Sequence, residues 1–87
     1  MENKNIEVKV HYIAAVKPFQ QEYTQETTVG QVKADALNKF GLKEEGNKTF
    51  KLFFNKTELT NSNEKLAQVA GDKHELNMDL EEFITQG

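Results

Sequence analysis

The sequence predicts a small α+β domain: a mixed sheet of four or five strands, one main helix packed across it, and a short second helix. Three observations carry this prediction. Apolar and polar residues alternate strictly over 6–12, apolar residues recur at helical spacing over 29–40, and strict alternation returns over 75–80. A chain of 87 residues can build one core but not two, so we expect a single domain.

The first two strands are predicted to pair as a hairpin. One strand is expected over 6–12, with an apolar face made by Ile6, Val8, Val10 and Tyr12. A second is expected over 19–23, after Pro18, where Phe19 and Tyr23 share a parity with Gln21. Gln21 is the weak point of that face because it is polar.

The main helix is predicted to begin after Thr28 and to end at Gly41. Its apolar stripe consists of Val29, Val32, Ala36, Leu37 and Phe40. The Thr28 hydroxyl is placed to accept the N–H of Gln31, whose side chain is expected to reach back in a capping box. Gly41 supplies the left-handed residue that ends the helix.

The second half of the chain predicts three shorter elements and a last strand. A strand is expected over 49–54, a very short one around Glu58 and Leu59, and a short helix over 64–70 ending at Gly71. The last strand is expected over 74–80, its apolar face made by Leu76, Met78 and Leu80. We expect the folded domain to comprise residues 1–80 and residues 81–87 to form a flexible tail.

Composition excludes several classes of function. There is no cysteine, and the net charge of −3 with scattered basic residues gives no reason to expect nucleic-acid binding. No apolar run approaches the roughly 20 residues of a membrane span, and the N-terminus lacks a signal-peptide pattern. His11 and His74 have no companions at metal-ligand spacing. We therefore expect a cytoplasmic monomer that is not an enzyme, needs no cofactor and binds no membrane.

The stretch "KLFFNKTELTNSNEKLAQVAGDKHELNMDL" resembles the β-grasp fold of ubiquitin-like proteins. More narrowly, "VKVHYIAAVKPF", "TTVGQVKA", "LAQVAG" and the terminal "ITQG" are similar to small ubiquitin-like proteins of bacteria, which are encoded beside activating-enzyme, conjugating-enzyme and peptidase homologues. The resemblance implies a protein modifier, activated with ATP by an adenylating enzyme and attached through its C-terminal glycine. It also implies a conjugating enzyme and a deconjugating peptidase as partners, and it leaves the target open.

The residues implied for conjugation are Gly87, with Gln86 and Thr85 before it. A terminal residue without Cβ can enter a narrow channel and leaves its carbonyl open to attack. The stretch from Glu81 to Gly87 would span roughly 20 Å if extended, at about 3.3 Å per residue. The sequence departs from ubiquitin here, because it has a single glycine after Gln86 and two acids, Glu81 and Glu82.

The resemblance also implies a partner surface. The positions that match ubiquitin's apolar patch are Phe53, Asn77 and Asp79, and only Phe53 is apolar. We expect Phe83 to contact a partner and Ile84 to extend the edge of the core, since Ile84 shares the parity of Leu80. The alternative is that both belong to the core.

Two other functions stay open at this point. The chain could be an interaction or scaffold module that is never conjugated and binds partners through its sheet. It could also be a sulfur carrier, in which the terminal carboxylate becomes a thiocarboxylate. Sulfur carriers usually end in paired glycines, unlike this chain.

Overall fold

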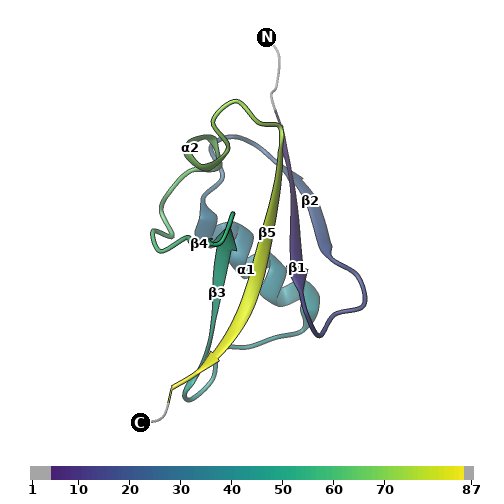
Figure 1. Ribbon diagram of the computed structural model, residues 1–87, viewed down its shortest axis with the longest axis vertical. Helices are drawn as coiled ribbons and strands as arrows, with labels where there is room; N and C mark the ends of the chain where they lie inside the picture. Colours follow the sequence, from purple (N-terminus) through teal and green to yellow (C-terminus); the bar gives the residue numbers. More distant parts are fainter. Residues whose placement is uncertain (1–4, 86–87) are drawn as a thin grey trace.

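The computed structural model describes residues 5–85 and confirms the predicted α+β architecture (Figure 1). A five-stranded sheet has the order β2-β1-β5-β3-β4, and the helix α1 lies across one face. The strands are β1 (Ile6–Tyr12), β2 (Phe19–Tyr23), β3 (Lys48–Phe54), β4 (Thr57–Glu58) and β5 (Glu75–Ile84). The helices are α1 (Val29–Phe40) and α2 (Leu66–Ala70).

The first and last strands lie side by side inside the sheet. β1 and β5 are parallel, from Glu7 opposite Glu75 to Tyr12 opposite Leu80. β2 pairs with β1, and β3 pairs with both β5 and β4, in antiparallel fashion. The last strand therefore leaves the domain from the interior of the sheet.

Helix α1 begins and ends where the sequence predicts. The N–H of Gln31 donates to the Thr28 hydroxyl at 3.3 Å, and Gly41 adopts φ 71° at the C-terminus. One detail of the prediction is wrong: the Gln31 side chain does not reach back to Thr28. Its amide nitrogen donates instead to Asp35 at 2.9 Å, and this bond turns the side chain toward the carboxylate one turn along the helix.

The core lies between α1 and the inner face of the sheet. Its sheet side comes mainly from alternate residues of β1, β3 and β5, and the helices contribute Val29, Val32, Ala36, Leu66 and Ala70. Gln21, the polar member of the β2 face, is exposed while Phe19 and Tyr23 are buried. On β5 the last buried residue is Leu80.

Strand β5 is longer than the sequence predicts. Residues 81–84, expected to begin a flexible tail, pair with β3 as far as Ile84 opposite Lys48. The physical reason is that β3 offers backbone partners along this whole stretch, whereas β1 ends opposite Leu80. Residues 48–51 of β3 and 81–84 of β5 thus form a two-stranded extension, which we call the β3–β5 arm. The arm extends away from α2 (Figure 1).

Candidate functional site

The outer face of the sheet brings together four of the predicted partner-binding residues. Side chains alternate along β5, so Asn77, Asp79 and Phe83 point away from the core that holds Leu76, Met78 and Leu80. Asp79 lies opposite Phe53 of β3 on one side and opposite His11 of β1 on the other. Phe53 and Phe83 belong to this face, which is the one opposite α1.

Phe53 and Phe83 form a tilted aromatic pair, with ring centroids 6.3 Å apart and an interplanar angle of 33°. The Lys51 Nζ lies 4.7 Å from the centroid of the Phe83 ring and 3.9 Å from a carboxylate oxygen of Glu58. Both rings are half-buried, although neither belongs to the core. Phe83 therefore lies outside the core, and its contact with a partner stays a prediction.

The predicted role of Ile84 in the core is wrong. Ile84 shares the parity of Leu80 but is 60% exposed. Residues of the same parity lie on the same face of a strand. Parity does not show how far the core extends beneath that face. Burial along β5 stops at Leu80, and Ile84 lies in the arm beyond that point.

The C-terminal segment is held in place at its last described residue. Thr85 donates its backbone N–H and its hydroxyl to the carbonyl oxygen of Asn47, at 2.9 and 3.0 Å. Two of the predicted conjugation residues, Gln86 and Gly87, lie outside the described residues. Thr85 therefore continues the arm and is not the middle of a free tail.

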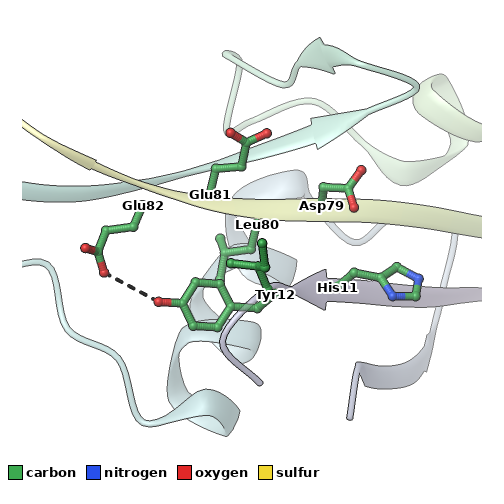
Figure 2. Close-up of a pocket in the computed structure, with 7 residues that line it drawn as sticks. His11, Tyr12, Asp79, Leu80, Glu81 and Glu82 are labelled. Atoms are coloured by element: carbon green, nitrogen blue, oxygen red, sulfur yellow. Dashed lines mark hydrogen bonds between the residues drawn. The ribbon is translucent and has the colours of Figure 1, made fainter. Parts of the chain in front are cut away.

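A hollow of about 450 Å³ lies where β1 ends and β5 continues (Figure 2). It is lined by His11, Tyr12, Ile13 and the β5 stretch 79–82. The Tyr12 hydroxyl donates to Glu82 Oε1 at 3.4 Å. Burial raises the pKa of Tyr12, and the charge and hydrogen bond of Glu82 raise it further.

Sequence reasoning missed this hollow. It treated Glu81 and Glu82 as parts of a tail, and only the pairing of β5 with β1 places them beside Tyr12 and Ile13. The hollow's lining holds the carboxylates of Asp79, Glu81 and Glu82 and no lysine or arginine. It is an acidic site with one apolar wall.

Two negative observations apply to residues 5–85. No three or more His, Cys, Asp or Glu side chains in this part of the chain are grouped so as to hold a metal ion. No helix in the same range combines the length and apolar character needed to cross a membrane.

No protein-family model matches the sequence, and no curated protein matches it either. Solved structures do match. The ubiquitin of Caldiarchaeum subterraneum superposes with a TM-score of 0.76 at 19% identity, covering 95% of this chain and 99% of that one. The ubiquitin-like domain of yeast Ddi1 gives 0.72 at 13% identity, covering 100% and 99%. Trypanosoma brucei ATG8 gives 0.70 at 16% identity, covering 97% and 78%.

These similarities agree with the element order and sheet topology described above. The expected β-grasp architecture is confirmed in each part: the mixed sheet, the main helix across it and the short second helix. The identities are low, so the likeness concerns the fold. The chain has the ubiquitin-like β-grasp fold.

Proposed function

We propose that this chain is a ubiquitin-like protein modifier, joined to a target through the carboxyl group of Gly87. In this proposal a partner adenylating enzyme uses ATP to convert the carboxylate to an acyl adenylate, releasing pyrophosphate. A nucleophile of the enzyme or target then displaces AMP. The chain supplies shape and an acyl group, and the partner supplies the catalytic groups.

One observation carries the proposal: the C-terminal segment continues directly from an interior strand of a ubiquitin-like sheet. β5 lies between β1 and β3, and its end runs into the arm on the side away from α2 (Figure 1). A partner can approach this end without disturbing the core, since no residue beyond Leu80 is buried among those described.

The arm limits how far the C-terminus can reach. In this proposal the reacting carboxyl group lies two residues beyond Thr85, a span of about 7 Å when extended at about 3.3 Å each. Release of the arm back to Leu80 would restore the roughly 20 Å expected from the sequence, at the same rise per residue. We therefore propose that activation includes the separation of residues 81–85 from β3 and Asn47.

Weak packing supports this opening step. Ile84 is largely exposed, Phe83 is half-buried, and Glu81 and Glu82 are exposed. Segments with few buried apolar contacts open at a lower free-energy cost than the core does. The arm is therefore the part of β5 that a partner enzyme could most readily separate from the sheet.

The partner surface of the modifier is proposed to be the outer face around Phe53 and Phe83. Asn77 and Asp79 make this face more polar than the apolar patch of ubiquitin that the resemblance implies. An activating enzyme, a conjugating enzyme or a deconjugating peptidase suited to this face would differ from those suited to ubiquitin.

The test is to mix the purified chain with a candidate adenylating enzyme and ATP, and to record intact masses. Formation of an acyl adenylate, a thioester or a conjugate supports the proposal, provided that deletion of Gly87 abolishes it. An adduct that forms equally well without Gly87 contradicts it. A mass change equal to the exchange of one oxygen for sulfur would identify a sulfur carrier instead.

The aromatic pair favours a second candidate, an interaction module that is never conjugated. Half-buried Phe53 and Phe83 on an otherwise polar face offer a partner an apolar contact that requires no reaction at the C-terminus. Partner binding that survives loss of Gln86 and Gly87 but is lost in Phe53→Ala would favour this candidate.

A further inference from the structure

The β1-facing edge of β5 is free beyond Leu80. Pairing between β1 and β5 ends with Tyr12 opposite Leu80, whereas β5 continues to Ile84 against β3 alone. Within residues 5–85, no strand pairs with this edge of 81–84. An unpaired edge presents backbone N–H and C=O groups that can bond to an added strand.

Carboxylates flank the free edge on both faces of the sheet. Glu81 and Glu82 project from opposite sides of β5, and Asp79 precedes them at the end of the paired region (Figure 2). Two lysines lie on the β3 side of the arm: Lys48 Nζ is 4.0 Å from Glu82, and Lys51 is the cross-strand partner of Glu81. The lining of the hollow contains three carboxylates and no lysine or arginine, so the edge favours a positively charged partner.

An exposed apolar loop lies at the same end of β1. Ile13 and Val16, in the loop between β1 and β2, are 101% and 98% exposed. They are two of the three large apolar residues that are mostly exposed among those described, and Ile13 also lines the hollow. Ile13 therefore lies beside the acidic edge and is available for contact with an apolar side chain of a partner.

We propose that the free edge of β5 binds an extended segment of a partner protein, added to the sheet as a strand in line with β1. The segment would carry two adjacent basic residues, because neighbouring side chains of a strand point to opposite faces, as Glu81 and Glu82 do. A bulky apolar residue beside them would contact Ile13. This inference does not depend on conjugation, since it involves the edge of β5 and not the carboxyl group of Gly87.

Charge decides against three other occupants. A second copy of this chain has a net charge of −3 and would bring its own acids to an acidic edge. Nucleic acid and anionic membrane surfaces would be repelled by the same carboxylates. A basic, extended protein segment satisfies both the backbone groups and the charges.

The test uses the full chain, labelled with ¹⁵N, and a capped hexapeptide probe with two adjacent lysines between valines. We expect the largest amide shift changes, and slowed hydrogen exchange, at residues 81–84, with further shift changes at Ile13. Glu81→Gln and Glu82→Gln should each weaken binding about two- to fivefold, the range of an exposed ion pair. Glu22→Gln, on the edge strand β2, is the matched control and should bind normally.

A second probe separates strand addition from simple charge attraction. The same peptide with alternate backbone nitrogens methylated keeps its charges but cannot form the strand ladder. We expect it to bind at least about fivefold more weakly, because each lost hydrogen bond contributes a factor of several. Equal binding of the methylated probe would overturn the proposal. So would shift changes centred on β2, equal weakening by Glu22→Gln, no binding, or self-association through this edge.

Discussion

The rings of Phe53 and Phe83 lie with their centroids 6.3 Å apart on the outer face of the sheet. Phe53 belongs to the part of β3 that pairs with the buried half of β5, and Phe83 belongs to the arm. The contact therefore joins the arm to the body of the domain. Lys51 of β3 contacts the same pair, because its Nζ lies 4.7 Å from the Phe83 ring centroid.

The aromatic pair should be energetically coupled. A double-mutant cycle of Phe53→Ala and Phe83→Ala, measured by urea unfolding, should give a coupling free energy of about 0.5–1.5 kcal/mol. The reason is that each single variant already removes the shared ring contact. Strictly additive losses of unfolding free energy would show that the two rings contribute independently.

Locking the arm should slow activation. In Lys48→Cys/Ile84→Cys the two residues are cross-strand partners, whose Cα atoms in an antiparallel pair lie about 4.5–5.5 Å apart, within disulfide range. The natural chain has no cysteine, so the bond would be unique. We expect the oxidised variant to be conjugated more slowly than the reduced one. The two single-cysteine variants should show no such redox dependence, and equal rates for both forms of the double variant would contradict arm opening.

Glu44 should stabilise the domain in a pH-dependent way. Its Oε2 accepts the N–H of Phe50 at 2.8 Å, the Thr49 hydroxyl at 2.7 Å and the Lys33 Nζ at 3.2 Å. The Phe50 N–H bond lowers the pKa of Glu44 most, followed by the Thr49 bond, with Lys33 adding to the effect. Each of these interactions favours the charged carboxylate.

The direction of this pH dependence follows from the lowered pKa of Glu44. The folded state binds the Glu44 proton less tightly than the unfolded state, so the stabilisation is present above the ordinary pKa of 4.5 and disappears as pH falls below it. Glu44→Gln should cost about 1 kcal/mol of unfolding free energy near pH 7, the contribution of a hydrogen bond to a charged group reduced by solvent exposure. The difference from wild type should shrink toward pH 3. A difference that is independent of pH would contradict the assignment.

Gly30 should resist substitution although it lies in the first turn of α1. Its N–H donates to the Ser62 carbonyl at 2.8 Å, and a Cβ at this position would meet that oxygen at 3.0 Å and the Ser62 Cβ at 3.1 Å. Gly30→Ala should therefore lower the unfolding free energy by about 1–3 kcal/mol, despite alanine's higher helix propensity. Lys39→Ala, at an exposed site on the same helix, is the control and should change stability by less than about 0.5 kcal/mol. If the Gly30→Ala variant were more stable than wild type, the loop around Ser62 would have to move freely.

Much of the fold could be predicted because it depends on local rules. Thr28 and Gly41 mark the ends of α1 through hydrogen bonds and backbone angles that involve only near neighbours. The alternation in β1 and β5 indicates their buried faces for the same reason.

The features that sequence reasoning missed depend on distant pairing. Residues 81–84 form a strand only because residues 48–51 lie beside them, and nothing in the local sequence indicates that register. The free edge and the acidic hollow arise where β1 stops and β5 does not. The exposure of Ile13 and Val16 likewise could not be predicted, since apolar residues in a loop fold back or remain exposed according to the tertiary structure.

The measurement that tests the central claim most directly is a tryptic map of ATP-dependent adducts. No lysine or arginine follows Lys73, so trypsin would leave residues 74–87 attached to any target. We expect branched peptides in which the Gly87 carbonyl is joined to a target side chain, formed only with ATP and the adenylating enzyme. Adducts joined through another residue, or formed equally by the chain lacking Gly87, would contradict it.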